Sequence, residues 1–100
     1  MTDIGKLVQV IRDLHGVEAT HVRSDPVHET FRGETAWEGI VEVFAIEGHP
    51  DARTAYAWSQ ETDAGGRRYI AVLGIRPVNT ARDAVRASIA AEHQSRKELQ

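Results

Sequence analysis

The spacing of apolar residues near the N-terminus predicts an α-helix. These residues recur at i, i+3, i+4 and i+7, the spacing of one helix face: Ile4, Leu7, Val8, Ile11 and Leu14. We expect this helix over residues 3–15, with Thr2 or Asp3 accepting a hydrogen bond from a free N–H of the first turn. Gly16 follows, and glycine takes the left-handed conformation that ends many helices.

The middle of the chain changes to a period of two, which is the period of β-strands. Pro26 cannot donate to a sheet ladder, so the first extended segment, within residues 18–32, lies at a sheet edge or breaks there. Further strands are expected at residues 35–47, 53–61 and 67–75. Turn-forming residues separate them: an Arg-Gly pair, then a Gly-His-Pro-Asp cluster, then a segment with two glycines.

A helical period returns after Pro77. Ala81, Val85 and Ile89 lie at i, i+4 and i+8, which predicts a narrow apolar face made largely of small residues. Thr80 and Asp83 have the spacing of a capping box. Because the chain is polar all round after Glu92, we expect residues 93–100 to fray.

The order of these elements predicts an α+β fold in a single domain over residues 1–100. We expect a mainly antiparallel four-stranded sheet, with the N-terminal and the C-terminal helix packed on one face. In the simplest register, the apolar residues of that face are Trp37, Val41, Val43, Ala45, Tyr56, Trp58, Ala71, Leu73 and Ile75.

The opposite face of the expected sheet is also apolar. Its most hydrophobic members are Ile40, Phe44, Ile46, Ile70 and Val72. Two short helices on one face leave these residues uncovered, unless the sheet curls or the first strand covers them. An open apolar surface of this size usually marks a contact. We therefore predict a homodimer through these five residues.

The composition narrows the classes of possible partner and the expected location. The formal net charge is -3, which argues against a globally basic nucleic-acid binder. No apolar run approaches the roughly 20 residues that span a bilayer. The chain has no cysteine, which favours a cytoplasmic location for so small a domain.

A local basic stripe runs down the C-terminal helix, and its members are Arg82, Arg86, Arg96 and Lys97. The order helix, antiparallel strands, helix is similar to that of double-stranded-RNA-binding domains. This resemblance is one of topology, because residues 79–86 lack the lysine cluster that begins the last helix of those domains.

Residues able to carry chemistry do not converge in the sequence. There is no Gly-x-Ser-x-Gly elbow and no phosphate-binding glycine loop, so we expect no catalytic, cofactor or metal site. His21 and His28 differ in parity along one strand, and surface positions are the favoured interpretation. His49 lies in a tight Gly-His-Pro loop, where its ring is expected to cap the turn.

Two other groups have a structural and a functional interpretation. Trp37, Tyr56 and Trp58 are compatible with an aromatic cage, but their parity favours core packing with polar tips bonded at the core edge. Four glutamates of the sheet region are compatible with paired catalytic carboxylates, but the wet rim of a sheet is favoured: Glu29, Glu38, Glu42 and Glu47.

Together these patterns predict a bacterial-type, non-enzymatic interaction or regulatory module that self-associates. One alternative is a small-molecule-binding domain that uses the second sheet face. The other is an RNA-binding domain that uses the basic stripe.

Overall fold

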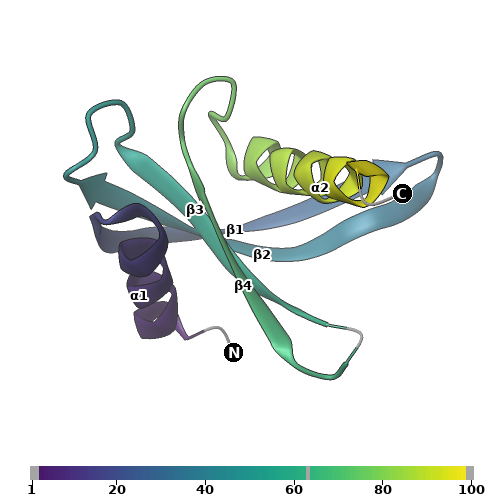
Figure 1. Ribbon diagram of the computed structural model, residues 1–100, viewed down its shortest axis with the longest axis horizontal. Coiled ribbons are helices and arrows are strands. Elements are labelled where there is room, and N and C mark those ends of the chain that lie inside the picture. Colours follow the sequence, from purple (N-terminus) through teal and green to yellow (C-terminus); the bar gives the residue numbers. More distant parts are fainter. Residues whose placement is uncertain (1–2, 63, 99–100) are drawn as a thin grey trace.

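Two helices accompany one four-stranded antiparallel sheet of strand order β1-β2-β3-β4 in the computed structural model (Figure 1). The structure describes residues 3–62 and 64–98, without the side chains of Phe31 and of residues 92–98. The elements are α1 (Ile4–His15), β1 (Glu18–Phe31), β2 (Glu34–Glu47), β3 (Thr54–Glu61), β4 (Arg67–Leu73) and α2 (Ala81–Glu98). The α+β arrangement and the order of elements expected from the sequence are confirmed.

Helix α1 begins and ends as its sequence predicts. The Asp3 carboxylate accepts a hydrogen bond from the Lys6 N–H at 3.1 Å. Gly16 takes a left-handed conformation, with φ of 68°, and its N–H donates to the Arg12 carbonyl at 2.8 Å. These bonds satisfy backbone groups that have no partner within the helix.

Helix α2 begins with the expected capping pair. Thr80 Oγ1 accepts from the Asp83 N–H, and the Asp83 carboxylate accepts from the Asn79 N–H, each at 3.1 Å. The bond from the Asn79 N–H lowers the pKa of Asp83. The backbone stays helical to Glu98, beyond the point at which fraying was expected.

The two helices lie on opposite faces of the sheet, so the prediction that both cover one face is wrong. Along β3, Tyr56 and Trp58 pack in the cluster that contains α2 residues, whereas Ala55 and Ala57 pack in the cluster that contains α1 residues. Successive side chains of a strand point to opposite faces, so these two clusters lie on the two sides of the sheet.

Each helix therefore has its own core. Buried members under α2 include Val41, Val43, Tyr56, Trp58, Ala84 and Val85. Buried members under α1 include Leu7, Ile11, Val17, Phe44, Ile46, Ala55 and Ala57. The second sheet face, which the sequence left open, is thus covered by α1 at Phe44 and Ile46.

The two faces expected for β4 are reversed, because the register between β3 and β4 differs by one residue from the simplest one. Trp58 pairs with Ile70 rather than with Ala71. This shift moves Ile70 to the α2 face and Ala71 to the α1 face. Ile75, expected on the core face, lies beyond the end of β4 and is exposed.

The sheet consists of two hairpins that separate at one end. β1 pairs with β2 along nearly its whole length. In contrast, β2 pairs with β3 only from the Glu42–Ala57 pair to the Ala45–Thr54 pair. Beyond Glu42 the β1–β2 hairpin and the β3–β4 hairpin diverge, and α2 packs beside the β1–β2 arm (Figure 1).

Candidate functional site: a tryptophan pocket between the hairpins

A cavity of about 420 Å³ opens where the two hairpins diverge beside α2. We call it the tryptophan pocket. Three consecutive residues of β2, three positions near the end of β3 and three residues of α2 line it: Ala36, Trp37, Glu38, Trp58, Gln60, Glu61, Val85, Ser88 and Ile89.

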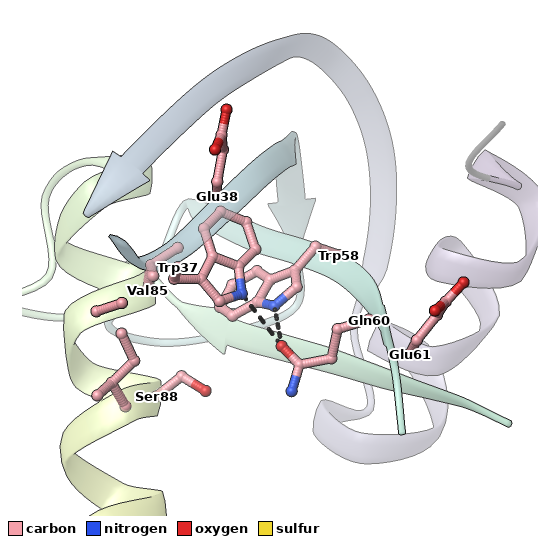
Figure 2. Close-up of a pocket in the computed structure, with 9 residues that line it drawn as sticks. Trp37, Glu38, Trp58, Gln60, Glu61, Val85 and Ser88 are labelled. Atoms are coloured by element: carbon pink, nitrogen blue, oxygen red, sulfur yellow. Dashed lines mark hydrogen bonds between the residues drawn. The ribbon is translucent and has the colours of Figure 1, made fainter. Parts of the chain in front are cut away.

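Two indole rings form the inner wall of the tryptophan pocket. The ring centroids of Trp37 and Trp58 lie 5.7 Å apart at an interplanar angle of 69°, an edge-to-face contact. Both indole N–H groups donate to the same oxygen, Oε1 of Gln60, at 3.2 and 3.4 Å (Figure 2). Trp58 is buried, with 1% of its surface exposed, whereas Trp37 is half-buried. Core packing with bonded polar tips is confirmed for Trp58.

Tyr56 follows the same rule at the other end of the α2 core. Its hydroxyl donates to the Asn79 carbonyl at 2.9 Å, and burial raises its pKa. Tyr56 does not line the tryptophan pocket, so the three aromatic residues do not form one cage.

The absence of a side chain at Gly39 allows the Trp37 ring to lie against β2. A Cβ atom at position 39 would lie 3.0 Å from the nearest ring atom of Trp37. Glycine therefore leaves the space in which the indole lies over β2. This close approach, together with the Gln60 bond, fixes the orientation of Trp37.

Polar groups are also available inside the tryptophan pocket. The hydroxyl of Ser88 forms no hydrogen bond with the described residues, and none of them accepts from the amide nitrogen of Gln60. Glu38 and Glu61 line the cavity, but their carboxylates point away from the indole pair (Figure 2). The pocket can therefore hold an apolar or aromatic group and offer it hydrogen bonds from neutral side chains.

The five residues of the predicted dimer interface do not share one surface. Phe44 and Ile46 are buried beneath α1. Ile70 and Val72 pack against the α2 core on the opposite face. Ile40 is the one member that is largely exposed, at 47% of its surface.

The basic stripe of α2 is partly neutralised. Arg82 and Arg86 both place Nε 3.1 Å from Oε1 of Glu29, which is buried on β1. A carboxylate shared by two guanidinium groups leaves less positive charge for a phosphate backbone. The side chains of Arg96 and Lys97 lie outside the described part of the structure.

Glu42 is also buried, so the interpretation of Glu29 and Glu42 as a wet rim is wrong. Its Oε1 lies 2.9 Å from His21 Nε2 and accepts a hydrogen bond from Ser24 Oγ. A bulge at Val22 changes the parity of β1. His21 pairs with Phe44 and His28 pairs with Glu38, so both histidines lie on the same face of the sheet although their positions differ in parity. Hydrogen bonds to His21 and Ser24 satisfy the buried carboxylate.

The other loop and strand histidines have structural roles. His49 Nδ1 accepts from the N–H groups of Asp51 and Ala52, at 3.0 and 2.9 Å, which confirms that the ring caps its turn. His28 Nε2 lies 2.9 Å from Thr35 Oγ1. Among the side chains that the structure describes, no three carboxylates or histidines form a cluster able to hold a metal ion.

Sequence reasoning found both tryptophans but missed Gln60 and Ser88. Gln60 shares the parity of Trp58, a signal that places its amide on the same face. Its contact with Trp37 depends on the angle between the hairpins, which local patterns do not encode.

Within the described ranges, no helix has the length and apolar content needed to cross a membrane. In comparisons with protein-family models, curated proteins and solved structures, none matches this chain.

Proposed function

We propose that the protein is a non-enzymatic interaction module that takes up a side chain of its partner in the tryptophan pocket. One observation carries this proposal: the half-buried indole of Trp37 lines an open cavity and is held in place by Gln60. A fixed aromatic wall loses little conformational entropy on binding, which is why tryptophan is enriched at binding hot spots.

The composition of the tryptophan pocket favours an apolar or aromatic side chain. Trp37, Val85 and Ile89 supply apolar surface, and Ser88 supplies a hydroxyl that has no hydrogen-bond partner among the described residues. Pockets with mostly apolar walls and a few polar groups are typical of binding sites. Only one part of the sequence-based interface, the exposed Ile40, remains available for self-association.

The proposal is tested with single amino acids as probes. We expect N-acetyl amides of leucine, phenylalanine and tyrosine to shift the indole N–H signal of Trp37 in ¹H–¹⁵N spectra. The probes should leave the amide signals of the α1 core, such as that of Phe44, unchanged. Ser88→Ala should reduce the shift caused by these probes, because Ser88 lines the pocket. Ser59→Ala is the matched control and should leave the shift unchanged, because Ser59 bonds Arg67 and does not line the pocket. No shift in the pocket with probes at about 10 mM, a range that detects even millimolar binding, would overturn the proposal.

Sedimentation tests self-association separately. If Ile40 contributes to a dimer, Ile40→Glu should yield a folded monomer. A wild-type monomer at high micromolar concentration would show that the module does not self-associate.

A further inference from the structure

We propose that the partner is an extended peptide that adds as a strand to β2 and alternates lysine or arginine with apolar residues. This inference rests on the proposed function, because the apolar side chains of the peptide enter the tryptophan pocket. It adds a second recognition element, the unpaired side of β2.

The unpaired side begins where the β2–β3 ladder stops. The last pair is Glu42 with Ala57, yet β2 extends back to Glu34 and β3 extends on to Glu61. No backbone hydrogen bond joins these two extensions, all residues of which are described. Both strands line the tryptophan pocket with consecutive or nearly consecutive residues, so the cavity reaches between them.

The register shows which backbone groups face this gap. The Ile46 N–H donates to the Arg53 carbonyl at 3.0 Å, so even-numbered residues of β2 direct their backbone groups toward β3. The same alternation directs the N–H and C=O of Glu38 and Ile40 into the gap. The position of Pro26 is consistent with this assignment. Pro26 pairs with Ile40, whose backbone groups face away from β1, so the pair needs no N–H from position 26.

Unpaired strand groups are a template for another strand. In an antiparallel addition, residues opposite Glu38 and Ile40 would point their side chains to the same face as these two residues. The intervening peptide side chains would point to the other face, which carries Trp37 and the tryptophan pocket. One added strand would therefore use both features at once.

Two exposed carboxylates beside the gap favour a partner with basic side chains. Glu38 is exposed and forms no ion pair with the described residues. Glu61, across the gap, is 83% exposed at its side chain, and its Oε1 lies 3.8 Å from Nη1 of Arg67. A basic side chain directly opposite Glu38 would form a cross-strand pair of opposite charge. Apolar residues on one face and basic residues on the other follow from this arrangement.

The probe is a blocked heptapeptide in which lysine alternates with leucine or phenylalanine. Its binding is followed by the tryptophan fluorescence and by amide hydrogen exchange. We expect the amides of Glu38 and Ile40 to exchange more slowly in the complex, while the exchange of amides in the β1 edge is unchanged. A version with glutamate in place of lysine should bind more weakly.

N-methylated peptides test strand pairing directly. In an antiparallel addition, the N–H groups of the lysine residues face β2. Methylation of those nitrogens should abolish binding, whereas methylation of the leucine and phenylalanine nitrogens should be tolerated. If both versions bind equally well, no strand forms and the inference is wrong.

A matched pair of protein variants tests the charge. Glu38→Lys should weaken binding by about three- to fivefold, the loss expected for an exposed ion pair. Glu47→Lys makes the same change at an exposed position of β2 outside the gap and should leave binding unchanged. Equal effects of the two variants would contradict a specific role for Glu38.

The outcomes separate this inference from the proposed function. If single amino-acid amides shift the Trp37 signal but the peptide protects no β2 amide, the pocket is a binding site and strand addition is wrong. If neither probe perturbs the pocket, both proposals fail. Protection of β4 edge amides instead of β2 amides would place the partner on another edge and overturn the inference.

Discussion

The two faces of the sheet are closed in different ways. Under α1, Leu7 and Ile11 pack on small sheet residues such as Ala55 and Ala57, and all four are fully buried. Under α2 lie large aromatic side chains with bonded polar tips, and beside them lies the tryptophan pocket. The α1 face is a conventional core, whereas the α2 face combines a core with an open site. From this difference we expect both faces to contribute to stability, and we propose that recognition uses the α2 face alone.

The largest expected effect tests the closed face. Phe44→Glu would leave an unpaired carboxylate beneath α1, where Phe44 has no exposed surface. We expect a loss of about 4–5 kcal/mol or more, enough to unfold much of the chain. Ile40→Glu is the matched control, because Ile40 shares this face but is exposed, and it should stay folded by circular dichroism. A folded Phe44→Glu monomer would instead show that α1 does not cover this position.

The next prediction compares the two tryptophans of the α2 face. Trp58→Ala should lower the free energy of unfolding by about 3–5 kcal/mol, because a buried aromatic ring loses its transfer energy and leaves a cavity. Trp37→Ala should have a clearly smaller effect, since Trp37 is half-buried on the wall of the pocket. Urea denaturation measures both. Equal losses would mean that Trp37 is part of a closed core.

A smaller effect is expected at Gly39. Gly39→Ala places a Cβ about 3.0 Å from the Trp37 ring, so the indole must move. We expect a loss of about 1 kcal/mol, at the low end for overpacking, and a change in tryptophan fluorescence. The double variant with Trp37→Ala should be no less stable than Trp37→Ala alone. Additive losses in the double variant would contradict a contact between the two residues.

The smallest effect concerns the start of α2. The bond from the Asn79 N–H lowers the pKa of Asp83 below its ordinary value of 3.8. A carboxyl group with a lowered folded-state pKa stabilises the fold above its ordinary pKa, and this contribution is lost as the pH falls through the lowered value. The stability difference between wild type and Asp83→Asn should therefore be present at pH 7 and shrink as the pH falls below the ordinary pKa of 3.8. A difference independent of pH would assign the effect to the shape of the side chain.

Local patterns in the sequence predict the elements but not their assembly. Asp3, Gly16 and the Thr80–Asp83 pair mark the helix ends because capping involves neighbouring residues. The side of the sheet that each helix covers depends on strand register, and one residue in the β3–β4 turn reverses the faces of β4. The bulge at Val22 reverses parity in the same way within β1.

The tryptophan pocket shows the same limit. Trp37 and Trp58 are visible in the sequence as aromatic residues of one parity. Their shared bond to Gln60 arises because the hairpins diverge beyond Glu42, and the ladder that ends there involves residues far apart in the chain. A pattern with a period of two carries no information on where neighbouring strands separate.

Fluorescence quenching by acrylamide tests the central claim, that α2 covers Trp58 but leaves Trp37 on the wall of an open pocket. The chain has two tryptophans, so Trp58→Phe reports on Trp37 alone and Trp37→Phe reports on Trp58 alone. The account predicts ready quenching of Trp37 and strong protection of Trp58, which is 1% exposed. Equal protection of both indoles would contradict an open pocket, and equal quenching of both would contradict the α2 core.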